Sequence, residues 1–147
     1  MVLLCKVQMV GWILFLLLLC CPALMAQTPE ETPEWRGVFC PQKTYLAQAV
    51  TEKGAWERLW QTSMGEKAPA LDFSKYVAAA IFLGEKPTGG YWIEFGAPRV
   101  TGGKMVISFK VHSPQPGQFV AQMLTQPFYL KAFPRMGAKE AAVEKMP

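Results

Sequence analysis

The sequence predicts an α+β, β-rich domain: an antiparallel sheet or small barrel of about five strands with one N-terminal helix. Short apolar or alternating segments recur along residues 36–135, and turns that contain glycine or proline separate them. Residues 51–63 instead repeat apolar side chains every three and four positions, as an amphipathic helix does. Because the turns between strands are short, consecutive strands are expected to pair as hairpins.

The helix is expected over Thr51–Ser63. Trp56 and Trp60 lie one turn apart, which places two tryptophans on one helix face. Thr51 suits the N-cap position, and Gly65 follows the last turn where a C-terminal cap would lie. Two large aromatic side chains on one face are typical of a helix that anchors a hydrophobic core.

The expected strands differ in pattern. Tyr76–Leu83 is an unbroken apolar run, which predicts a strand buried on both faces, and its alanines leave room for the helix to lie across it. Lys104–His112 alternates, so its apolar side chains are expected to share the inward face. Shorter strands are expected over Arg36–Cys40, Tyr91–Phe95 and Gln126–Phe133.

Residues 1–26 have the order of a secretory signal peptide. A single charged residue, Lys6, precedes an apolar run that Pro22 ends, and Ala26 offers a small residue for cleavage. An uncleaved N-terminal anchor and a lipoprotein acylated at Cys21 are the alternatives, and only these two forms would bring the protein to a membrane. All three forms place the domain outside the cytoplasm: periplasmic, extracellular or associated with the cell envelope.

Two further segments flank the predicted domain of residues 36–135. Residues 27–35 contain two prolines and three glutamates, which predicts an extended linker. Residues 136–147 are polar and rich in alanine, which predicts a flexible tail.

After cleavage, 14 basic residues (15 less Lys6) and 11 acidic ones remain, scattered along the chain. No basic stripe with interleaved aromatics is present, so we expect no nucleic-acid partner.

Groups that could support catalysis or metal binding are few. Three of the four cysteines lie in the signal, so Cys40 alone remains and no internal disulfide can form. One cysteine and one histidine, His112, cannot supply the four ligands of an all-Cys/His zinc site. Asp72 is expected to open a strand and His112 to close one, while Cys40 lies in an apolar strand where a thiol is inert. We therefore expect a non-catalytic domain without metal or cofactor.

One segment is denser in glycine and aromatic residues than folding requires. Its residues are Pro87, Thr88, Gly89, Gly90, Tyr91 and Trp92. It is either a glycine turn that leads into a strand, or a loop whose bare backbone and flanking aromatics contact a partner. Pro127 and Phe128, at the start of the last expected strand, complete the set of candidate partner-binding residues.

The motifs in residues 45–135 resemble the C-terminal domain of the PrcB family. The resemblance rests on these segments: Ala55-Trp56, Leu59-Trp60, Asp72-Phe73, Leu83–Ile93 with its Gly-x-x-Pro-Thr-Gly-Gly-Tyr core, Pro114–Gly117 and Leu124–Phe128. That family is named for a lipoprotein-like subunit of a bacterial surface protease complex. The resemblance implies an exported binding or assembly domain, an accessory subunit of a secreted or cell-surface protease, with a protein partner. It brings no catalytic residues.

A second similarity is to chagasin-type cysteine-protease inhibitors, which present three loops on an immunoglobulin-like sandwich. Pro87–Tyr91, Thr101–Gly103 and Gln126–Phe128 occur here in the same order, although Lys86 and Gln126 replace the inhibitors' asparagine and arginine. Inhibition would require the three loops to cluster, since loops more than about 20 Å apart can hardly share one interface-sized patch.

Overall fold

The strand β3 (Tyr76–Phe82) is buried on both faces, as its apolar run predicts. The computed structural model describes residues 31–147, which form one unit, and the expected signal peptide lies outside the described residues. Ala78 and Ala80 contribute to one hydrophobic cluster, whereas Val77 and Ala79 contribute to another on the opposite face. This strand therefore separates two cores.

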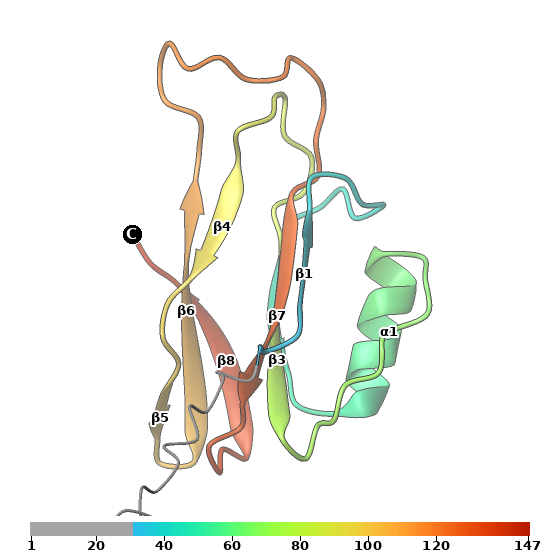
Figure 1. Ribbon diagram of the computed structural model, residues 1–147, viewed down its shortest axis with the longest axis vertical. Coiled ribbons are helices and arrows are strands. Elements are labelled where there is room, and N and C mark those ends of the chain that lie inside the picture. The colour runs from blue at the N-terminus through green and yellow to red at the C-terminus, as the bar shows by residue number, and fades with distance from the viewer. Residues whose placement is uncertain (1–30) are drawn as a thin grey trace, which may run out of the picture. The chain divides into compact units, whose positions relative to one another are not determined.

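The first sheet is antiparallel and places β3 between two neighbours. Its strand order is β1 (Glu34–Gly37), β7 (Phe128–Pro134), β3 and β2 (Leu46–Val50). Figure 1 shows α1 (Lys53–Ser63) lying along one face of this sheet. Consecutive strands in the sheet are mostly not consecutive in the chain, because β7 inserts between β1 and β3.

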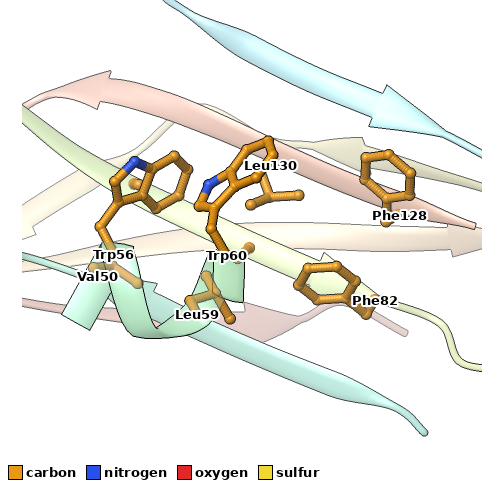
Figure 2. Packing of buried hydrophobic residues seen from close by; sticks show 9 residues of the cluster. Val50, Trp56, Leu59, Trp60, Phe82, Phe128 and Leu130 are labelled. Atoms are coloured by element: carbon orange, nitrogen blue, oxygen red, sulfur yellow. The ribbon is translucent and has the colours of Figure 1, made fainter. Parts of the chain in front are cut away.

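The helix α1 buries the two tryptophans that the sequence predicted as its anchor. The rings of Trp56 and Trp60 lie 5.5 Å apart between centroids, and Trp35 of β1 lies 5.3 Å and 5.8 Å from them. Figure 2 shows both helix tryptophans on one side of the sheet, with Leu130 beside them. Because Ala78 and Ala80 of β3 have short side chains, the helix can pack its aromatic face directly against the sheet.

The start of the helix differs from the expectation, whereas its end agrees. The helix begins at Lys53, and Glu52 occupies the N-cap position without a side-chain capping hydrogen bond. Thr51 is held instead by Arg135, whose Nη2 donates to the Thr51 carbonyl at 2.5 Å. Gly65 does follow the last turn, and its N–H donates to the Trp60 carbonyl at 3.1 Å.

The second sheet is built around β6 (Lys104–His112), which has the bounds that the alternation predicts. Its partners are β4 (Trp92–Phe95), β5 (Arg99–Thr101) and β8 (Glu140–Lys145), the last of them parallel. Lys104 pairs with Thr101 on one edge of β6 and with Glu140 on the other. Between β4 and β5, residues 96–98 face only residues 107 and 108, which makes a β-bulge.

The second sheet packs on the face of β3 that α1 leaves free. Met105 and Ile107 of β6 lie in one cluster with Val77 and Ala79. Phe109 continues this packing against Ile81. The domain is thus a sequence of three layers: helix, first sheet and second sheet.

Several expectations about the strands were wrong. The described residues contain eight strands rather than about five, in two sheets that do not close into a barrel. The helix follows two strands and is not N-terminal. β2 pairs with β3 although the helix lies between them in the chain, and β4 and β5 pair with β6. β3 and β4 lie in different sheets, so the short turn between them does not make a hairpin.

The expectation of a flexible tail over residues 136–147 was also wrong. Residues 140–145 form β8, which pairs in parallel with Lys104–Phe109. Ala141 and Val143, two positions apart, are half-buried against the core of the second sheet. At the other end, Glu34 and Trp35 belong to β1 and not to the expected linker. Within residues 31–147 no helix is long and apolar enough to cross a membrane.

Candidate partner-binding site

Three loops meet at one end of the domain, which we call the apical end. They are residues 38–45, 84–91 and 113–127. The N–H of Gln126 donates to the Val38 carbonyl at 2.8 Å, and Lys86 and Thr125 exchange backbone hydrogen bonds of 2.8 and 3.0 Å. In Figure 1 the loop of residues 113–127 arches beyond the ends of the strands. The opposite, basal end carries residues 72–75, the β5–β6 turn and residues 135–139 (Figure 1).

The glycine-rich segment of residues 87–92 lies beneath the loop of residues 113–127. Thr125 Oγ1 donates to the Thr88 carbonyl at 2.8 Å, and the Gly89 N–H donates to the Ala121 carbonyl at the same distance. These bonds join two segments that are far apart in the sequence. The segment is therefore a support for the longer loop.

The two glycines are explained by contacts within the chain. Gly90 has φ +85°, and a Cβ atom on it would lie 2.7 Å from Val120 Cγ1 and 3.1 Å from Pro114 Cβ. A Cβ on Gly89 would lie 3.4 Å from Ala121 Cβ. The bare backbone thus lets the loop of residues 113–127 approach closely, and this close approach needs no external partner.

The candidate residues predicted from the sequence differ in exposure. Pro87, Gly90 and Trp92 are exposed, whereas Thr88, Gly89 and Tyr91 are half-buried. Pro127 and Phe128 are buried, and the Phe128 ring stacks on Phe82 in the first core. Their side chains therefore do not belong to an exposed surface, although the sequence grouped them with it.

Trp92 forms a cluster with two polar residues on the outer face of the second sheet. Its ring stacks on the His112 imidazole, with centroids 3.8 Å apart and planes at 4°. His112 Nε2 lies 2.7 Å from Glu94 Oε2. Since Trp92 follows one apical loop and His112 precedes another, the cluster joins the bases of the two loops.

The apical end also exposes large apolar side chains that the sequence analysis did not identify. They are Val38, Phe39, Tyr45, Phe119, Met123 and Leu124. Phe119 is fully exposed, at 103% of its reference area. A sequence signal was present, because residues 113–127 contain no charged side chain. An apolar surface of this kind can hold a partner, but it has no group that performs chemistry.

The Cys40 thiol is not arranged as a nucleophile. Its Sγ lies 3.4 Å from the Gln126 carbonyl oxygen, and burial raises the pKa of the thiol. Cys40 packs against the helix-side core, whereas His112 lies on the second sheet, on the outer face with Trp92. The two residues therefore do not form a catalytic dyad.

Asp72 is likewise separate from His112. It lies at the basal end, and its carboxylate accepts hydrogen bonds from the Ser74 hydroxyl at 2.6 Å and the Ser74 N–H at 2.9 Å. These bonds lower the pKa of the Asp72 carboxyl. No group of three or more histidine, cysteine, aspartate or glutamate side chains suited to a metal gathers within residues 31–147.

The arrangement required for chagasin-like inhibition is absent. Thr101–Gly103 form the β5–β6 turn at the basal end, whereas Pro87–Tyr91 lie at the apical end (Figure 1). The strand β6 separates them, and its nine residues span about 26 Å at about 3.3 Å per residue. Loops at opposite ends of this strand cannot contact one cleft, so this alternative fails.

Comparison with known proteins identifies one family. Residues 77–134 match the PrcB C-terminal family, which confirms the resemblance over this segment. The match is shorter than the residues 45–135 over which the resemblance was drawn, and it leaves out α1 and β2. No curated protein and no solved structure matches the chain. The matched segment contains two of the three apical loops.

Proposed function

We propose that this chain is an exported, non-catalytic binding or assembly domain that acts as an accessory subunit of a secreted or cell-surface protease. The observation that carries the proposal is the match of residues 77–134 to the PrcB C-terminal family, which is named for a subunit of a protease complex. The resemblance thus supplies the kind of partner, and the apical loops within the match supply a surface that could hold it.

The placement of the reactive side chains supports a binding role. Cys40, Asp72 and His112 lie in three different parts of the domain. The His112 imidazole is bonded to Glu94 and stacked on Trp92, and neither of these side chains is a nucleophile that it could activate. We expect the purified domain to leave casein intact. Proteolysis of casein that is lost when the His112 imidazole or the Cys40 thiol is removed would contradict the non-catalytic role.

Copurification tests the partner. The full-length chain, tagged at its C-terminus and expressed in its native host, is recovered from the envelope and medium fractions, and its partners are identified by mass spectrometry. We expect a protease in amounts comparable to the tagged chain, and none with an unrelated exported protein that carries the same tag. Recovery without a protease in either fraction would remove the proposed function.

Export is tested by the mass of the mature chain. Cleavage after Ala26 would leave Gln27 as the first residue, acylation at Cys21 would add the mass of a lipid, and an anchor would retain residues 1–26. We expect the cleaved form. A chain found only in the cytoplasm would contradict all three forms.

A further inference from the structure

We infer that the apical end binds its protein partner through an apolar, uncharged contact centred on Phe119, Met123 and Leu124. The inference rests on the proposed function, and it adds where the partner binds and which chemistry its surface must have.

The exposed apolar side chains come from two loops that lie side by side. Met123 and Leu124 are 50% and 57% exposed, and Val38 and Phe39 are 47% and 55% exposed. The hydrogen bond from the Gln126 N–H to the Val38 carbonyl joins the two loops two residues after Leu124. Since soluble monomers rarely leave large apolar side chains grouped on their surface, such a group marks a contact with another molecule.

The charged residues of the apical end indicate what kind of partner surface can bind there. The three apical loops contain three charged side chains, Lys43, Glu85 and Lys86, and the loop of residues 113–127 contains none. A charged partner surface would lose hydration against this loop without gaining an ion pair. The partner is therefore expected to present an uncharged apolar hollow, and the projecting Phe119 ring is the side chain that would enter it.

The polar side chains of the same loop favour a protein over a lipid bilayer. Gln115, Gln118 and Gln122 are exposed among the apolar residues. Gln118 Oε1 accepts a hydrogen bond from the Gln115 N–H at 3.0 Å, and Gln122 Nε2 donates to the Val120 carbonyl at 3.2 Å, so the loop bonds one end of each of these amides. The other polar end of each amide would lose its hydration in hydrocarbon, which is costly. A protein surface can satisfy these amides while it buries the apolar side chains between them.

Shape argues against a second copy of this chain. The loop of residues 113–127 projects beyond both sheets (Figure 1), so two apical ends would meet as two convex surfaces. Stable protein interfaces bury about 800 Å² on each partner, which convex tips do not provide. A partner with a concave surface does.

The direction of β1 shows on which side the described chain enters the domain. The strand β1 runs toward this end, and just before it the Pro33 carbonyl accepts a hydrogen bond from the Ala132 N–H at 2.8 Å. The described chain therefore enters the domain away from the apical loops.

A photoreactive side chain at position 119 tests directly which molecule binds the apical end. In the full-length chain, Phe119 is replaced by p-benzoyl-phenylalanine, and Met136, which is 54% exposed at the basal end, is replaced in a matched control. After irradiation in the native host, we expect position 119 to crosslink the same protease that copurifies with the chain, and position 136 not to do so. Crosslinks from 119 to lipid, or to a second copy at twice the mass, would overturn the inference.

Binding by surface variants separates this inference from the proposed function. With the copurified partner, we expect Met123→Ser/Leu124→Ser to bind at least about tenfold more weakly than the natural chain, and Met136→Ser to change binding less than about twofold. Circular dichroism melting is expected to show that each variant is folded. A protease that still copurifies and binds these variants at full strength would overturn the apical contact but keep the proposed function. Absence of any protease partner would remove both.

Discussion

The helix-covered face of the first sheet and the apical end both carry large apolar side chains, but they use them differently. Trp56 and Trp60 are 1% and 5% exposed, and each contacts the other and Trp35. Phe119 is 103% exposed. The aromatic residues of the helix thus stabilise the fold, whereas the apical phenylalanine contributes no packing to it.

The two regions are also held in different ways. Side-chain contacts hold α1 on the sheet. Backbone hydrogen bonds join the apical loops, from Gly89 to Ala121 and between Lys86 and Thr125, and the buried Thr125 hydroxyl adds a side-chain bond to Thr88. A loop held by its backbone can leave its side chains free, so the fold separates the residues that stabilise it from those available for contact.

The largest effect on stability is expected at the helix. Trp60→Ala removes a buried indole between Trp35 and Trp56 and should lower the free energy of unfolding by about 3–5 kcal/mol. Urea unfolding followed by circular dichroism measures this change. A loss below about 1 kcal/mol would contradict the view that the tryptophan cluster anchors the helix.

A smaller effect is expected where the apical loops touch. Gly90→Ala should destabilise by about 2–4 kcal/mol, because the added methyl overlaps Val120 and the φ of +85° suits glycine. Gly117→Ala is the matched control: its φ is +81°, but no atom lies within 4 Å of the added methyl. The control should lose only about 1–2 kcal/mol of strain energy. Equal losses in thermal melts of the two variants would show that the close approach is unimportant.

The pH dependence of stability should report the contact between β1 and β7. The Tyr129 hydroxyl donates to Glu34 Oε2 at 2.7 Å. Burial, together with the Glu34 carboxylate, raises the pKa of Tyr129 to about 12, and the hydrogen bond from Tyr129 lowers the pKa of Glu34. The free energy of unfolding should therefore fall as pH rises from about 10 through about 12, because unfolded tyrosine ionises near 10.

At acid pH the same contact makes the free energy of unfolding fall as the pH decreases. The Glu34 contribution is present above the ordinary carboxyl pKa and is lost as the pH falls through the lowered value in the folded protein. Tyr129→Phe should reduce both pH dependences, as denaturant titrations at a series of pH values can measure. An unchanged alkaline limb in this variant would assign that limb to another group.

The smallest effect on stability is expected at Phe119. Phe119→Ser should change the free energy of unfolding by no more than about 0.5 kcal/mol, because the ring is fully exposed. The same urea unfolding measurement applies. A loss comparable to that of Trp60→Ala would show that Phe119 packs in solution and would remove the contrast between the two regions.

Elements with a long, consistent pattern were predicted correctly. The periodicity around Trp56 and Trp60 gave the helix, and the alternation of Lys104–His112 gave β6 with its bounds. Leu46–Val50 and Glu140–Lys145 were missed, since both are short and rich in alanine. These segments become strands because β3 and β6 offer them an edge to pair with.

The candidate site shows the same limit of prediction from local sequence. The sequence singled out residues 87–92 for their glycines, and the structure explains those glycines by the approach of Val120 and Pro114. It grouped Phe128 with them, but β7 begins at this residue and places its ring in the core. It passed over Phe119, because local sequence does not tell an exposed aromatic residue from a buried one.

By itself the sequence determined the β-rich class, the helix with its tryptophan anchor, the strand buried on both faces and the resemblance to the PrcB family. These depend on local periodicity and on motifs, which are properties of neighbouring residues. Only the tertiary structure decided the strand order, the parallel β8 and the exposure of the apical loops. These depend on which distant segments pair, and pairing is settled by the burial of both partners at once.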